Sequence, residues 1–184
     1  MSICGAMKTT QDQNGDVWLS KSTDSGAITI QRAALTADVS RALIGQLNAE
    51  LSAMYPEAGA NHFRLDPDEV ADGRGAFLVM YHGGTPVACG AVRLLDAQTA
   101  ELKRMYVVRA MRGKGMGRRL VAALEFEARM LHARRLVLET GIRQTAAIAL
   151  YQATGFQPIP LYGEYCLSPD TSVCLGKDLT ERVM

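Results

Sequence analysis

A glycine-rich segment between an expected strand and an expected helix constrains the fold of this chain more than any other feature. It runs from Arg112 to Gly117 and reads Arg-Gly-Lys-Gly-Met-Gly. Apolar spacing predicts a strand over about 100–108 before it, a helix to about His132 after it, and a strand over about 135–140 beyond that. A strand, a crossover helix and a strand form a βαβ unit, whose two strands run parallel.

The rest of the chain predicts antiparallel strands before this unit and a closing hairpin after it. Strands are expected at about 27–32, 75–81, 86–95, 156–161 and 172–175, and helices at about 36–55, 66–72 and 145–153. The turn at 82–85 contains two glycines, which supply the positive φ of a hairpin turn. The expected fold class is therefore α/β (α+β), with strands of both orientations.

Length and composition limit the chain to one globular domain. It has 184 residues, of which 48% are hydrophobic and 21% charged, as in ordinary soluble domains. Residues 1–26 are polar and are expected to form a flexible arm, so the compact domain spans 27–184. The 20 basic residues balance 19 acidic ones, which predicts that neither nucleic acid nor an anionic membrane is a partner.

Cysteine usage and the lack of a targeting pattern predict a cytoplasmic protein. The sequence has four cysteines, Cys4, Cys89, Cys166 and Cys174, which form no C-x-x-C pair, and only three histidines. We therefore expect free thiols and no metal site. No apolar run reaches the roughly 20 residues of a membrane span, and the first residues lack the pattern of an export signal. No feature indicates a protein partner, and the sequence allows either a monomer or a homodimer.

The glycine-rich segment also lies within a basic stretch. Seven basic residues and no acidic one occur between Lys103 and Arg119. Successive backbone N–H groups in such a loop can bind an anion, and the dipole of the following helix adds positive potential. A diphosphate suits this site. The spacing matches neither the P-loop nor the Rossmann fingerprint, and a solvated glycine turn is the alternative explanation.

This stretch resembles the GCN5-related N-acetyltransferase (GNAT) superfamily. Arg112, Gly115 and Gly117 meet its signature Q/R-x-x-G-x-G/A, and residues 150–156 resemble its L-Y-x-x-x-G-F ending. The resemblance spans about 27–179. It implies a mixed, mostly antiparallel central sheet with a splayed parallel strand pair and helices on both faces.

The resemblance also implies acetyl-CoA as cosubstrate. Backbone amides of the glycine-rich segment, called the glycine loop below, would hold its diphosphate. The backbone of the preceding strand would pair with its pantetheine arm. The cofactor residues implied are Met105, Tyr106, Val107, Arg112, Gly113, Lys114, Gly115, Met116, Gly117, Arg118 and Gln144. Gln144 stands where relatives often place an asparagine.

Two residues are expected to act in catalysis. By resemblance, Tyr151 hydrogen-bonds the leaving sulfur; the alternative is a core tyrosine that packs the last helix. Glu101 lies at the position of a strand glutamate that serves some members as the base. Alternation also places it on the same face as Lys103, so an ion pair is the alternative. Glu139, at the carboxyl end of the next parallel strand, and a water chain are further candidates.

The expected reaction is acetyl transfer from acetyl-CoA to a primary amine of a small molecule or peptide, by direct attack in a ternary complex. Four acidic residues near the expected acceptor walls could favour a cationic amine: Asp66, Asp68, Glu69 and Glu164. The alternative function is a CoA-binding regulatory module that has lost turnover.

Overall fold

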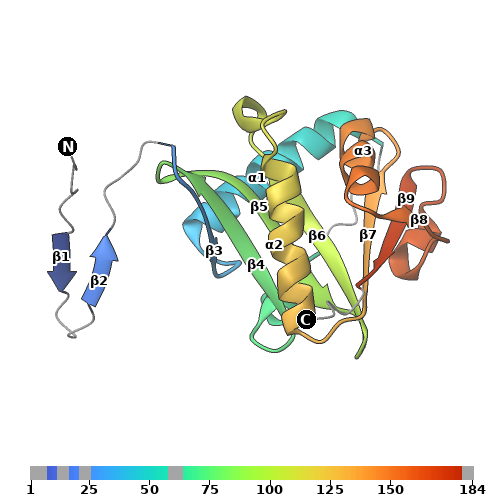
Figure 1. The fold of residues 1–184 in the computed structure, drawn as a ribbon. Coiled ribbons are helices and arrows are strands. Elements are labelled where there is room, and N and C mark those ends of the chain that lie inside the picture. Colours follow the sequence, from blue (N-terminus) through green and yellow to red (C-terminus); the bar gives the residue numbers. More distant parts are fainter. Residues whose placement is uncertain (1–7, 12–16, 21–25, 58–63, 180–184) are drawn as a thin grey trace.

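The computed structural model describes residues 8–11, 17–20, 26–57 and 64–179 (Figure 1). Most of the arm expected over 1–26, including Cys4, lies outside these residues. Two of its segments are described, β1 (Lys8–Gln11) and β2 (Val17–Ser20), and they pair antiparallel.

A mixed seven-stranded sheet forms the centre of the described residues. Its order is β3-β4-β5-β6-β7-β9-β8, and only β6 and β7 pair in parallel. The strands are β3 (Ile28–Arg32), β4 (Gly75–His82), β5 (Thr85–Leu94), β6 (Thr99–Val107), β7 (Arg135–Gly141), β8 (Gln157–Pro158) and β9 (Ser172–Asp178). The predicted mixed, mostly antiparallel sheet with one parallel pair is confirmed.

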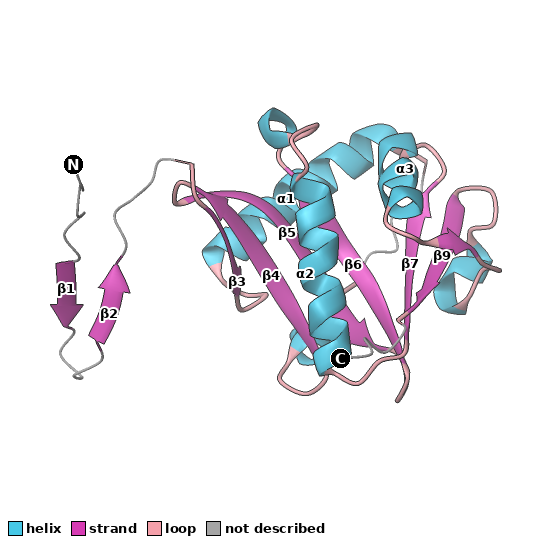
Figure 2. Cartoon of the chain, viewed as in Figure 1, coloured by secondary structure: helices cyan, strands magenta, loops and turns pink. Residues whose placement is uncertain are grey.

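Three α-helices and three short 3-10 helices accompany the described strands. They are α1 (Asp38–Met54), η1 (Pro67–Val70), η2 (Arg109–Met111), α2 (Met116–Met130), α3 (Thr145–Ala153) and η3 (Gly163–Leu167). Figure 2 shows α1 and α2 on opposite faces of the sheet. The expected helix at 66–72 is shorter than predicted, because η1 gives way to extended backbone at Ala71.

Two ends of elements also differ from the expectation. Helix α1 begins two residues after Thr36, because Ala34–Ala37 first form a turn in which Ala37 N–H bonds the Ala34 carbonyl at 3.0 Å. Strand β9 continues to Asp178, because it pairs with β7 along the whole length of that strand. By contrast, β8 pairs with β9 through two residues alone.

The central strands bury both of their faces, so their sequence is apolar throughout. On β4, Leu78 and Met80 face α2 and pack in one core cluster with its Leu124. The alternate residues Phe77 and Val79 face α1 and pack in a second cluster. The sheet is thus covered on both sides, as the fold class predicted.

The parallel pair separates halfway along its length. Strands β6 and β7 are in register from Thr99 opposite Arg135 to Leu102 opposite Leu138. Beyond this point β6 continues along β5 to Val107, and β7 continues along β9 to Gly141. The two strand ends therefore diverge and leave an opening between them.

A β-bulge lies in β6 beside this opening. Lys103 is opposite Ala91 and Tyr106 is opposite Cys89, so Arg104 and Met105 together face Gly90 of β5. Arg104 adopts a φ of 57°, which is rare for a residue with a side chain. Such a bulge redirects side chains and increases the local twist.

Gly90 is expected to leave room for the side chains packed beside this bulge. A Cβ at Gly90 would lie 2.8 Å from both Leu124 Cδ1 and Met105 Sδ, so Gly90→Ala should lower the free energy of unfolding by about 1–2 kcal/mol through overpacking. The control is Gly45→Ala on α1, where a Cβ meets nothing within 4 Å. It should raise stability by about 0.5–1 kcal/mol. Urea denaturation would measure both, and equal effects would contradict the packing argument.

Candidate active site

A cleft of about 540 Å³ opens where β6 and β7 diverge. Its walls are the end of β6, the glycine loop, α1 and the start of α3. The sequence-predicted residues that line it are Met105, Tyr106, Val107, Arg112, Gly113, Gly115, Met116, Gly117, Arg118, Gln144 and Tyr151. Lys114 and Glu101 are not among the lining residues. The structure thus brings most of the predicted cofactor residues together.

The glycine loop ends at the N-terminus of α2. Gly113 and Gly115 have φ values of 73° and 78°, in the left-handed region that favours glycine. Gly115 is the N-cap residue, and no side chain caps the helix. The first N–H groups of α2 therefore lack a side-chain acceptor at the wall of the cleft, which suits an anionic ligand.

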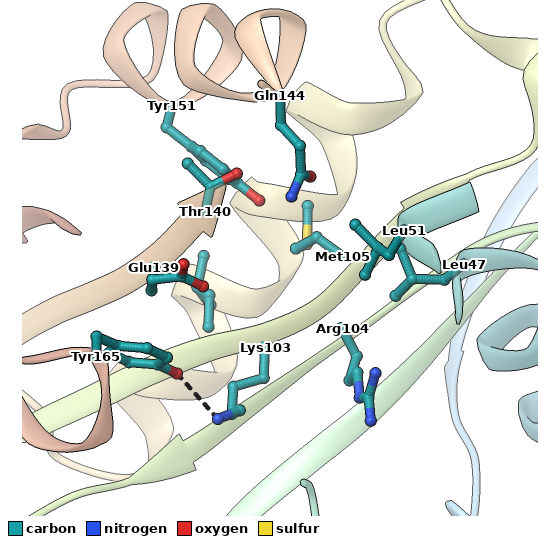
Figure 3. Close-up of a pocket in the computed structure, with 11 residues that line it drawn as sticks. Leu47, Leu51, Lys103, Arg104, Met105, Glu139, Thr140, Gln144, Tyr151 and Tyr165 are labelled. Carbon is teal, nitrogen blue, oxygen red and sulfur yellow. Dashed lines mark hydrogen bonds between the residues drawn. The ribbon is translucent and has the colours of Figure 1, made fainter. Parts of the chain in front are cut away.

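A second, smaller cavity of about 60 Å³ adjoins the cleft (Figure 3). The residues that line both are Leu47, Leu51, Met105, Gln144 and Tyr151. The remaining lining is more polar and includes Lys103, Arg104 and Glu139. The glycine loop, the long cleft and the small polar cavity are therefore adjacent to one another.

Tyr151 stands where the two cavities meet. It is buried on α3 and packs edge-on against Phe156, with ring centroids 5.8 Å apart. Burial raises the pKa of its phenol, and the nearby charge of Glu139 adds to the effect. The hydroxyl therefore stays protonated at neutral pH and can act as a hydrogen-bond donor.

Comparisons with known proteins agree with this architecture. Residues 43–156 match the model of the acetyltransferase (GNAT) family. The chain belongs to this family. An IAA acetyltransferase of Azospirillum brasilense is 38% identical over 143 residues, which are 77% of this chain and 92% of that protein. The chain is therefore an acyltransferase.

Solved structures share the fold. A candidate acyl-CoA N-acyltransferase of Klebsiella pneumoniae aligns with a TM-score of 0.70 and 34% identity, over 83% of this chain and 98% of that one. A GNAT family acetyltransferase of Elizabethkingia anophelis, solved with acetyl-CoA bound, aligns with a TM-score of 0.56 and 19% identity, over 85% of this chain and 99% of that one.

In this acetyltransferase, Arg112 connects the glycine loop to α1. It bonds both carboxylate oxygens of Glu50, at 2.9 and 2.7 Å, and donates to the Val107 carbonyl at 2.9 Å. Burial alone would raise the pKa of Glu50, but hydrogen bonds from Arg112 and Tyr106 outweigh it and lower that pKa. Glu50 was not predicted, because only the folded chain brings it to Arg112, a signature residue 62 positions away.

Tyr55 holds the loop between β7 and α3. Its hydroxyl accepts a hydrogen bond from the backbone N–H of Arg143 at 2.8 Å. A Cβ at Gly141 would collide with this hydroxyl, which explains the glycine at the end of β7. The loop continues into Gln144, whose side chain points toward the cavity in Figure 3. Tyr55 continues the four-residue spacing of the buried leucines of α1, but its bond to a loop 88 residues away depends on the folded chain and was not predicted.

Glu101 is fully buried and lines neither of the two cavities. One carboxylate oxygen accepts hydrogen bonds from the hydroxyls of Tyr162 and Tyr165, each at 2.8 Å. The other accepts a hydrogen bond from Arg93 Nε at 2.8 Å, and Arg93 Nη2 lies 2.7 Å from it in an ion pair. Lys103 Nζ lies 3.8 Å away. The pair with Lys103 that the sequence allowed is thus one part of a larger buried network.

Glu139 lies within the small cavity. Burial raises the pKa of its carboxyl, against the smaller opposing effects of a hydrogen bond from Ser172 and the charge of Lys103. A carboxyl with a raised pKa holds a proton more readily near neutral pH. Glu139 therefore has the chemistry of a proton acceptor beside Tyr151.

Of the four acidic residues considered for the acceptor, three contact basic ones: Asp66, Glu69 and Glu164. Glu164 accepts from Lys103 Nζ at 3.1 Å. Glu69 accepts from Arg93 and, at 2.8 Å, from the backbone N–H of Asp66. The carboxylate of Asp66 accepts from Arg64 at 3.0 Å. These contacts neutralise much of the negative charge that the sequence places near the site.

Three of the cysteines, Cys89, Cys166 and Cys174, are free thiols, as expected. Burial raises the pKa of the Cys89 thiol to about 12, so it is no candidate nucleophile. Within the described ranges, no group of three His, Cys, Asp or Glu side chains could hold a metal ion. Across the same residues, no helix has both the length and the apolar character that a bilayer crossing requires.

Glu101 is expected to be a determinant of stability. Glu101→Gln removes the counter-charge of Arg93 inside the protein and should lower the free energy of unfolding by about 3 kcal/mol. The control is Asp72→Asn, because Asp72 is fully exposed and contacts Arg32 at 3.4 Å; it should cause no measurable change. Thermal and urea denaturation would measure both, and an unchanged Glu101→Gln protein would contradict the role of the network.

Proposed function

We propose that the chain transfers the acetyl group of acetyl-CoA to a primary amine of a small molecule or peptide, by direct attack in a ternary complex. The observation that carries the proposal is the meeting of the long cleft and the small polar cavity at Tyr151. The cosubstrate and the amine would approach this residue from opposite sides. The family and the IAA acetyltransferase of A. brasilense support the reaction type.

The residues of the cleft fit acetyl-CoA. The backbone amides from Gly113 to Arg118 would hold the diphosphate, because they follow left-handed glycines and open an uncapped helix. Tyr106 and Val107 pair with β5 on one side, and the pairing of β6 with β7 ends at Leu102, before Met105. A pantetheine arm bears amides that could bond this second side. When bound, acetyl-CoA supplies an activated acetyl group as a thioester.

Tyr151 would assist the departure of sulfur. The carbon–nitrogen bond forms as the carbon–sulfur bond breaks, and the negative charge that leaves on sulfur needs a donor. Because burial raises the pKa of the phenol, transfer of its proton to a thiolate is more unfavourable than for an exposed tyrosine. We expect Tyr151 to stabilise the thiolate by a hydrogen bond rather than by giving up its proton.

The amine must lose one proton during the transfer. The sequence offers Glu101 and Glu139 as its acceptor, besides a water chain. The contacts favour Glu139, because it lines the cavity next to Tyr151, whereas three hydrogen bonds and the ion pair with Arg93 occupy the carboxylate of Glu101. Glu101 would then support the site by orienting Tyr165 and Lys103.

Tyr151→Phe tests the proposed function. The substitution keeps the buried ring, so we expect kcat for amine acetylation to fall about 100-fold while the Kd for acetyl-CoA stays within about twofold. A free-thiol assay and calorimetry would measure the two quantities. Tyr81→Phe is the control, since Tyr81 lines neither cavity. Wild-type rates in Tyr151→Phe would refute its role, and binding without thiol release from any amine would favour the regulatory module.

Glu139→Gln tests the proton acceptor through pH dependence. Since burial raises the pKa of Glu139, the wild-type rate should fall with decreasing pH through a value above the ordinary glutamate pKa, and the variant should lose this limb. The raised pKa also means that ionisation of Glu139 opposes folding. The penalty is absent at low pH and appears as the pH rises through the folded-state pKa.

The melting temperature of Glu139→Gln should accordingly exceed that of the wild type at pH 8 and match it at pH 4. Glu101→Gln, assayed at a temperature where it is folded, should keep the acidic limb. The opposite pattern, with the limb lost in Glu101→Gln and kept in Glu139→Gln, would assign the proton to Glu101.

A further inference from the structure

Tyr55 connects the end of α1 to the loop between β7 and α3. It directly follows the last residue of α1, and its backbone N–H bonds the Leu51 carbonyl at 2.8 Å. Its side chain is 3% exposed and packs in the core cluster between α1 and the sheet. The hydroxyl at the end of this buried ring accepts the hydrogen bond from the Arg143 N–H at 2.8 Å. One side chain thus joins the core to a loop of the site.

The loop fits closely around the Tyr55 ring. Gly141, at the end of β7, leaves no room there for a Cβ, which would collide with the hydroxyl. The guanidinium of Arg143 lies 5.0 Å from the centre of the ring and donates to the Met54 carbonyl at 2.7 Å. The strand end, the backbone N–H and the guanidinium therefore all contact the same tyrosine, which restricts where the loop can lie.

The position of this loop determines where α3 begins. Gln144 is the N-cap residue of α3. Its N–H bonds the Gly141 carbonyl at 2.9 Å, and its own carbonyl accepts from the N–H groups of Ala147 and Ile148 at 3.0 Å each. No side chain caps this helix. The turn that Tyr55 contacts is therefore also the turn that starts α3.

Helix α3 carries side chains that meet both cavities. Gln144 and Tyr151 are seven residues apart, which is close to two helical turns, so they lie on the same face. Both line the cleft and the small cavity, and Figure 3 shows them entering from α3, across from Leu47 and Leu51 of α1. A shift at the start of α3 would move the phenol of Tyr151, and a small misplacement of a catalytic group is costly in rate.

We propose that Tyr55 is a positioning residue for acetyl transfer: its hydroxyl holds the loop before α3 and thereby places the phenol of Tyr151 where the sulfur departs. The inference rests on the proposed function, since it assigns a role in the same reaction. Tyr55 lines neither cavity, so it acts through Tyr151 and not by contact with a substrate.

The first test is Tyr55→Phe, which keeps the packed ring and removes the hydroxyl. We expect kcat to fall about 10-fold, the effect of losing one hydrogen bond that orients a catalytic group, while the Kd for acetyl-CoA stays within about twofold. Calorimetry would count the acetyl-CoA sites, and kcat expressed per site excludes unfolded protein. Tyr81→Phe is the matched control, because Tyr81 packs against the same core cluster and should keep the wild-type kcat. An unchanged kcat in Tyr55→Phe would overturn the proposal.

A double substitution distinguishes positioning from a general loss of stability. If Tyr55 acts through the hydroxyl of Tyr151, then Tyr55→Phe should change kcat by less than about twofold in a Tyr151→Phe background, since the group that it positions is gone. The fall in melting temperature caused by Tyr55→Phe should be the same in both backgrounds. A full 10-fold loss of kcat in the Tyr151→Phe background would overturn the role assigned to Tyr55.

Amide hydrogen exchange separates this inference from the proposed function. In Tyr55→Phe the N–H of Arg143 should exchange about 10-fold faster than in the wild type, because its acceptor is lost, whereas the amides of β9 should keep their rates. Acetylation of an amine, together with unchanged exchange and unchanged kcat in Tyr55→Phe, would overturn the inference and leave the proposed function standing. Faster exchange in a protein that acetylates no amine would instead overturn the proposed function, and with it the catalytic role of this contact.

Discussion

The site depends on two parallel strands that stop pairing halfway. Backbone N–H and C=O groups inside a protein need partners, and β6 and β7 provide them for each other only as far as Leu102 and Leu138. Each strand then keeps one neighbour, β5 or β9. The glycine loop follows β6, and the loop that leads into α3 follows β7. Both loops therefore lie at the opening between the two strands. The end of the pairing between β6 and β7 thereby positions the cleft and two of its walls.

The buried charge of Glu101 lies one residue before this divergence and stabilises its surroundings. Glu101 is opposite Val137 in the register with β7. Its carboxylate accepts hydrogen bonds from Arg93 on β5, from Tyr162 just before η3 and from Tyr165 in η3. Isolated, such a charge would be costly to bury. Compensated by Arg93 and two tyrosines, it attaches η3 to the sheet and brings Tyr165 to the wall of the small cavity. The network links the small cavity to the central strands.

The sequence predicted the features that depend on local pattern. The βαβ unit and the glycine loop follow from spacing within a few tens of residues, and Tyr151 follows from the resemblance to the family. The structure has the loop, the cleft and Tyr151 together. The partners of Glu101 were not predicted beyond Lys103, because Tyr162 and Tyr165 lie 61 and 64 residues away in the chain. The bulge at Arg104 was missed for another reason: strand alternation is expected by default, and a basic residue gives no sign of left-handed backbone.

The strand order of the sheet has a consequence for synthesis on the ribosome. Strand β8 is made before β9 but lies outside it in the sheet, so it cannot dock until β9 has emerged and paired with β7. During that interval β7 presents an open edge, the kind of surface on which nascent chains aggregate. Glu101 also lacks its two tyrosine donors until η3 arrives. The small cavity is therefore completed last. A chaperone that covers the edge of β7 would protect the nascent chain from aggregation until then.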